Sequence, residues 1–125
     1  MEEKNLRLFK VSIPKHLDGE GGWHQNKKHW STKTLREASV NLEEFDIPLC
    51  AIDLDTSPWT MSNFLYILYH IKRIEDSDLN YPILQDPTGC IIDGWHRIAK
   101  AILNGDTTIK AKRLNVMPEY DSIDG

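Results

Sequence analysis

Apolar and polar residues alternate along this chain in a way that predicts short strands and about three helices. Every-other-residue alternation predicts a strand over residues 6–13, and an apolar run predicts another over residues 47–54. Apolar residues three or four positions apart predict helices over residues 34–45, 58–74 and 95–104. The predicted fold class is therefore α/β in the broad α+β sense, with a small mixed sheet and about three helices.

Residues 81–114 contain the clearest succession of elements. Ile83-Leu84 and Cys90–Ile92 are short apolar runs on either side of Asp86-Pro87-Thr88-Gly89. Asp, Pro and Gly stand at the positions of a type I turn that favour them, so this stretch predicts a β-hairpin. A helix ended by Asn104-Gly105 should follow, and then a strand over residues 109–114.

End signals refine the first two helices. Thr34 with Glu37 three residues later predicts the N-cap of the first helix. Ser57 as N-cap and Pro58 at the first helical position predict the start of the second. In that second helix the side chains expected to face the core are Met61, Phe64, Leu65, Leu68 and Ile71, and those expected to face mostly outward are Tyr66, Tyr69, His70, Lys72 and Arg73.

The junction between the predicted hairpin and the third helix, Asp93-Gly94-Trp95-His96-Arg97, is the main candidate for chemistry. Glycine permits unusual backbone dihedrals there, and the first turn of a helix has free N–H groups and the positive end of the helix dipole. Together with imidazole and guanidinium donors, these groups suit a phosphate. The structural alternative is that Arg97 pairs with Asp93 or Asp106 and that His96 holds the turn.

The run Ile92–Ala101, followed by Gly105 and the predicted strand 109–114, resembles the G-x-H-R or G-x-R-R signature of the ParB/sulfiredoxin-like superfamily. The resemblance covers about residues 47–114. It implies that Gly94, Trp95, His96 and Arg97 lie at a nucleotide site for ATP or CTP, with Ser57 and Thr60 as secondary contacts. Trp95 occupies the position of the catalytic cysteine of sulfiredoxins, so reduction of cysteine sulfinic acid is not expected. The Gly-Glu-Arg-Arg form of chromosome partition proteins is also absent.

Three carboxylates are candidate catalytic groups if the protein transfers a phosphoryl group. Asp53 and Asp55 follow the predicted strand 47–54 and could hold the Mg²⁺ of a nucleotide, or could be exposed edge charges; Asp93 lies in the junction itself. Carboxylates that converge on the His96–Arg97 turn would favour an enzyme. Dispersed carboxylates would favour a binding protein.

Composition limits the remaining possibilities. The 125 residues suit one domain, residues 1–114, followed by an acidic tail, residues 115–125, expected to be disordered or loosely docked. The net charge of −4 argues against broad nucleic-acid binding. Cys50 and Cys90 predict buried free thiols in a reducing compartment, and the charged N-terminus without an apolar span predicts a cytoplasmic protein with no membrane partner.

Residues 16–34 are rich in Gly, His, Lys and Trp and predict a long loop. This loop is the basis of an alternative function: a small non-enzymatic regulatory protein that engages a protein or a nucleic acid through it. Its histidines, His16, His24 and His29, fit no familiar metal-ligand spacing, so no metal site is predicted.

Overall fold

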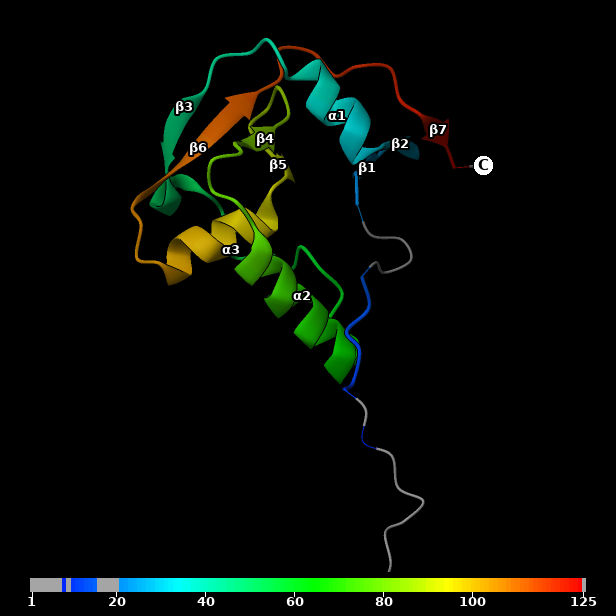
Figure 1. Cartoon of the computed structure of the whole chain (residues 1–125). Helices are drawn as coiled ribbons and strands as arrows, with labels where there is room; N and C mark the ends of the chain where they lie inside the picture. The colour runs from blue at the N-terminus through cyan, green and yellow to red at the C-terminus, as the bar shows by residue number, and fades with distance from the viewer. Residues whose placement is uncertain (1–7, 9, 16–20, 125) are drawn as a thin grey trace, which may run out of the picture.

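The structure, a computed structural model, describes residues 8, 10–15 and 21–124 of the chain (Figure 1). Within this part of the chain the helices are α1 (Thr32–Ala38), α2 (Phe64–Asp76) and α3 (Trp95–Leu103), with a 3₁₀ turn, η1 (Leu49–Ala51). The strands are β1 (Trp23–Gln25), β2 (Lys28–Trp30), β3 (Phe45–Pro48), β4 (Ile83–Gln85), β5 (Ile91–Asp93), β6 (Thr108–Arg113) and β7 (Ser122–Ile123). The predicted α+β class with three helices is confirmed for the described residues.

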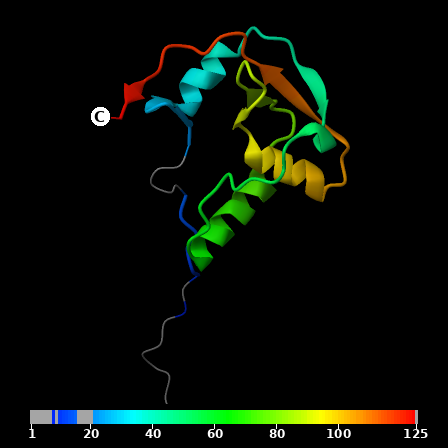
Figure 2. The same cartoon turned by 180° about the vertical axis from the view of Figure 1, so that it is seen from behind.

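The larger sheet has the strand order β3-β6-β4-β5. Strand β6 runs antiparallel to β3 and parallel to β4, whereas β4 and β5 are antiparallel. The predicted mixed sheet is therefore present. Helix α3 connects β5 to β6, and it lies against one face of the sheet beside α2 (Figures 1 and 2).

The predicted β4–β5 hairpin is confirmed, and Asp86 holds its turn. The amide of Gly89 donates to the carbonyl oxygen of Asp86 at 3.0 Å, which closes the four-residue turn. The buried carboxylate of Asp86 accepts from the amides of Thr88 and Cys90, both at 2.9 Å, and from the Thr88 hydroxyl at 2.7 Å. These bonds satisfy backbone amides of the turn that have no partner in the strand ladder.

Side chains of β4 and β5 alternate between two cores, as the twofold repeat of a strand requires. Ile83 and Ile91 join Ile98 of α3 in one buried cluster. Leu84 and Ile92 join Leu35 of α1 in the other. The sheet thus carries α3 on one face and α1 on the opposite face, and its edge at the end of β5 lies between them.

A second sheet, with the order β1-β2-β7, corrects the prediction of a long loop over residues 16–34 and includes part of the tail. Residues 23–30 of the expected loop form a hairpin with a two-residue turn, Asn26-Lys27, in which both residues have positive φ. That geometry matches the twist of the flanking strands. The acidic tail is docked: β7 pairs with β2, and Trp30 donates its indole N–H to the Pro118 carbonyl at 2.7 Å. Residues 16–20 lie outside the described residues.

Helix α1 begins two residues before the predicted position and ends at Ala38 instead of residue 45. Its N-cap is Ser31, not Thr34, because the Ser31 hydroxyl accepts from the Thr34 amide at 3.1 Å. Ser39 ends the helix, and Phe45 belongs to β3 instead.

Helix α2 differs more from prediction, because it begins at Phe64 with Asn63 as its N-cap, and not at Ser57-Pro58. The Asn63 side chain accepts from the Tyr66 amide at 3.0 Å. The buried residues of α2 are Tyr69 and His70, which were expected to face outward, whereas Phe64 of the expected core face is 71% exposed. The face of α2 that packs against the rest of the protein is therefore opposite to the face predicted.

Three further expectations are corrected. Residues 8 and 10–13 form no strand, and the rest of the predicted strand 6–13 lies outside the described residues. The predicted strand 47–54 ends at Pro48, because η1 follows. Cys50 and Cys90 are free, as predicted, but exposed, because they lie in η1 and next to the hairpin turn. Among the helices that the structure describes, none has the length and apolarity needed to cross a membrane.

Candidate functional site

The candidate site begins at Gly94, which follows β5 directly and is the N-cap of α3. The strand-to-helix junction predicted from the sequence is confirmed. Gly94 has φ 117° and ψ 16°, a left-handed conformation, and a Cβ there would stand 2.5 Å from Cγ2 of Ile83. Only glycine fits both restrictions. Because Gly94 has no side chain to cap α3, the first-turn amides of α3 have no side-chain acceptor from it.

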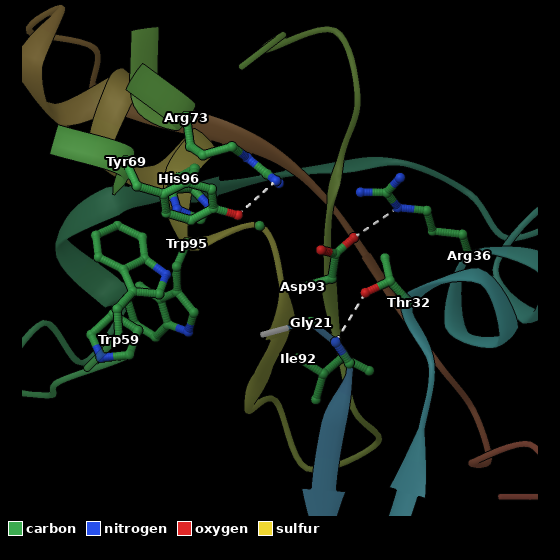
Figure 3. Close-up of a pocket in the computed structure, with 13 residues that line it drawn as sticks. Gly21, Thr32, Arg36, Trp59, Tyr69, Arg73, Ile92, Asp93, Trp95 and His96 are labelled. Atoms are coloured by element: carbon green, nitrogen blue, oxygen red, sulfur yellow. Dashed lines mark hydrogen bonds and ion pairs between the residues drawn. The ribbon is translucent and has the colours of Figure 1, made fainter. Parts of the chain in front are cut away.

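A cavity of about 380 Å³ lies against this junction, and we call it the His96 pocket. Gly94, Trp95 and His96 line it from the start of α3. Figure 3 shows Trp59, Tyr69 and Arg73 on one side of it and the Arg36–Asp93 pair on the other. The full lining also includes Gly21, Gly22, Thr32, Pro58 and Ile92. The pocket therefore lies where α1, α2 and the start of α3 meet the segment before α2 and the residues that precede β1.

Two histidine rings stack on Trp59 at one wall of the pocket; Trp59 and His96 line the pocket, whereas His70 is buried. The indole of Trp59 lies 4.3 Å from the ring of His96 and 4.6 Å from that of His70, centroid to centroid, and both pairs are nearly parallel. Nδ1 of His70 and Nε2 of His96 are 2.9 Å apart, so one ring donates and the other accepts. At most one of the two rings can be a positively charged imidazolium while this hydrogen bond is kept.

His96 is held in its neutral form. Burial lowers the pKa of His96 from 6.5 to about 4, and the positive charge of Arg73, the neighbouring His70 and Arg97 act in the same direction. Asp93 opposes the shift. At neutral pH His96 can therefore offer a ligand a hydrogen bond but no positive charge.

The positive charge of the pocket comes from Arg36 and Arg73 instead. Arg73 donates to the Tyr69 hydroxyl at 3.2 Å, and Arg36 donates from Nε to Oδ2 of Asp93 at 3.1 Å. Asp93 is the one carboxylate among the described residues that line the pocket. Two arginines, one aspartate and the positive end of the α3 dipole make this an anion-attracting cavity.

Arg97, a predicted phosphate ligand, is engaged with the protein. Its Nη2 donates to Oδ2 of Asp93 at 3.2 Å and to the Pro82 carbonyl at 3.3 Å, and the side chain is 11% exposed. It does not line the His96 pocket. This environment matches the structural alternative that the sequence leaves open, in which Arg97 pairs with Asp93.

The other predicted residues are not gathered around the turn. Asp53 and Asp55 are exposed, and Oδ1 of Asp53 accepts from the Asp55 amide at 3.0 Å. Asp53 and Ser57 line an adjoining cavity, of which Trp95 also forms part. Thr60 is exposed and lines neither of these two cavities. In the described part of the chain, no three His, Cys, Asp or Glu side chains are arranged to hold a metal ion.

Sequence reasoning missed the wall formed by Trp59, Tyr69 and Arg73. The apolar periodicity of α2 placed Tyr69 and Arg73 on the solvent side, and no local pattern marks Trp59. A signal did exist for the hairpin that borders the pocket. The order Trp-His-Gln-Asn-Lys-Lys-His-Trp is nearly mirror-symmetric about an Asn-containing two-residue turn, and in the structure Trp23 pairs with Trp30 and His24 with His29.

Comparison of the chain with protein-family models, with curated proteins and with solved structures found no match. The resemblance to the ParB/sulfiredoxin-like superfamily stays a prediction from the residues of the motif.

Proposed function

We propose that the chain binds a nucleotide or another phosphate ester in the His96 pocket, through the Gly94-Trp95-His96 turn, with ATP or CTP accompanied by Mg²⁺ as candidate ligands. The observation that carries the proposal is the presence in one cavity of the α3 N-terminus and of two arginines, Arg36 and Arg73. Helix N-terminal amides and guanidinium groups are recurrent phosphate ligands. The superfamily resemblance of the motif points to the same chemistry.

The distribution of carboxylates supports binding without turnover. Phosphoryl transfer needs a general base and a metal site near the transferred group. Asp53 and Asp55 do not line the His96 pocket, and the Asp93 carboxylate accepts from both Arg36 and Arg97. A Mg²⁺ ion in the pocket would therefore be held mainly through the phosphates of its nucleotide.

The alternative function, binding of a protein or nucleic acid through residues 16–34, has weaker support. The β1–β2 hairpin carries Lys27 and Lys28, but the tail docks on it: the Asp124 amide donates to the Lys27 carbonyl at 2.7 Å, and Lys28 lies over the Tyr120 ring. The tail thus occupies part of the surface that the hairpin would offer to a partner. We also propose a cytoplasmic location, because the two exposed cysteines remain free, as they do in a reducing compartment.

Calorimetric titration with ATP and CTP, with and without Mg²⁺, tests the proposal. Arg73→Ala should weaken binding roughly 10- to 150-fold, because a hydrogen bond to a charged group is worth about 1.5–3 kcal/mol. Lys72→Ala is the matched control, since it removes the same charge from the next residue of α2, where Lys72 pairs with Asp76 outside the pocket. Absence of saturable binding, or equal losses in both variants, would contradict the proposal.

Phosphate release from the same nucleotides should be measured in parallel. We expect none above the uncatalysed rate. Turnover abolished by Asp93→Asn would instead place the protein among enzymes.

A further inference from the structure

A second cavity, of about 360 Å³, lies between the end of α1 and the segment that leads into β4. We call it the Val40–Tyr81 pocket, after the two exposed apolar side chains that line it. Pro82 and Leu84 complete its apolar lining, and Lys112 enters from β6. Arg36 and Asp93 line both pockets, so the two adjoin. Arg36 belongs to the proposed nucleotide site as well, and Arg97 belongs to the motif, but the proposed function assigns no ligand to this second cavity.

The charged lining of the Val40–Tyr81 pocket is unbalanced. Arg36, Arg97 and Lys112 contribute three positive charges, and Asp93 is the one carboxylate among the described residues that line it. Charges of one sign gathered in a cleft raise the local concentration of the opposite ion. A cleft with this excess of positive charge suits an anionic ligand.

The hydrogen bonds that these cations already make limit the ligand. Lys112 donates from Nζ to the carbonyls of Ser39 and Val40, at 3.1 and 3.4 Å, which uses two of its three protons. Arg97 is bound through Nη2, and its buried Nε has no acceptor among the described residues. Arg36 uses only Nε toward described residues, so its two terminal nitrogens are available.

A terminal guanidinium fork and one ammonium N–H match the two oxygens of a planar carboxylate. The exposed side chains of Val40 and Tyr81, each about two-thirds solvent-accessible, offer an apolar surface beside that charge. The volume of this cavity lies within the range of ligand sites. We infer that the Val40–Tyr81 pocket binds a small carboxylic acid with an aromatic or short aliphatic body, its carboxylate between Arg36 and Lys112.

Benzoate is a suitable probe, followed by amide chemical shifts in a nuclear magnetic resonance titration of the full chain. We expect saturable shifts at the amides of Ser39, Val40, Tyr81 and Lys112, which border the pocket. Benzyl alcohol, which has the ring without the charge, should produce much smaller shifts. The nucleotide titration reports instead on residues 94–96, so failure of the proposed function and failure of this inference are distinguishable.

Val40→Glu places a negative charge in the lining of the pocket and should weaken benzoate binding about tenfold, because the glutamate and the benzoate carboxylate repel each other. Val116→Glu is the matched control: Val116 is also exposed but does not line this pocket. It should change the affinity less than about twofold, which is within measurement error. Lys112→Met, which keeps the stem of the side chain, should also weaken binding.

Three outcomes overturn the inference: no saturation by about 1–10 mM benzoate, equal effects of the two glutamate substitutions, or shifts confined to residues 94–96. Tighter binding of phenyl phosphate than of benzoate at the same amides would also overturn it, since the site would then be one for phosphate esters.

Discussion

Arg36 and Arg97 offer a direct test of how burial sets the strength of an ion pair. Both donate to the same atom, Oδ2 of Asp93, at 3.1 and 3.2 Å. They differ in exposure, because the side chain of Arg36 is 57% exposed and that of Arg97 is 11% exposed. Replacing each by alanine removes one guanidinium from one carboxylate and changes mainly the environment of the lost bond.

The expected losses follow from the contacts. Arg97→Ala removes a largely buried charge-assisted bond, worth about 1.5–3 kcal/mol, and a bond to the Pro82 carbonyl, worth about 1 kcal/mol. It also relieves the buried Nε of Arg97, which has no acceptor in the described part of the chain, and this returns about 1 kcal/mol. The net loss should be about 2 kcal/mol. Arg36→Ala breaks an exposed pair and should cost about 0–1 kcal/mol.

Thermal and urea unfolding of the two variants measure this difference. At about 4 °C per kcal/mol for a domain of this size, Arg97→Ala should melt about 8 °C below the unsubstituted protein and Arg36→Ala about 0–4 °C below it. Arg97→Lys should fall between the Arg97→Ala variant and the unsubstituted protein, because lysine keeps the charge and loses the planar fork.

Nucleotide titration of folded Arg97→Ala completes the test. Because Arg97 does not line the His96 pocket, its affinity should stay close to that of the unsubstituted protein. An unchanged melting temperature with an affinity lowered tenfold or more, about 1.4 kcal/mol, would refute this reasoning. It would indicate that Arg97 contacts the nucleotide.

Two further predictions concern the same junction. Gly94→Ala should lower the free energy of unfolding by about 2–5 kcal/mol, because of the strain of a left-handed alanine and the contact of its Cβ with Ile83. Gly105 is the control: it also has positive φ, but the space around its Cβ is open, so Gly105→Ala should cost only about 1–2 kcal/mol. Equal losses in urea unfolding would exclude a packing restriction at Gly94. His96 binds fewer protons in the folded state than in the unfolded one, since its pKa is about 4 against 6.5, so its contribution to stability is complete above pH 6.5 and is lost as the pH falls toward 4. Between pH 7 and pH 4 the unsubstituted protein should therefore lose more stability than His96→Asn, and parallel pH profiles would contradict the neutral-histidine assignment.

The sequence by itself determined the elements whose causes are local. Asp86 and Gly89 specify a tight turn through bonds within five residues, so the β4–β5 hairpin could be predicted. Gly94 marks the junction because few other residues adopt positive φ, and α3 follows with the predicted start. The candidate anion site could be located for the same reason, since free amides at a helix N-terminus are a property of the helix itself.

Only the tertiary structure decided the orientation of α2. Periodicity identifies an apolar stripe but does not say which side of a helix meets the rest of the protein. Here Tyr69 and His70 are buried and Phe64 is exposed, because His70 stacks on Trp59 and shares a hydrogen bond with His96, residues outside α2.

Long-range pairing was equally inaccessible from local patterns. The Asp121 carboxylate accepts from the Ser31 amide across 90 positions of sequence, and β7 completes the sheet of the β1–β2 hairpin. Arg36 and Arg73 reach one cavity from separate helices, α1 and α2. Contacts of this kind depend on which surfaces fold together, so the charge of the site, unlike its glycine turn, was set by packing.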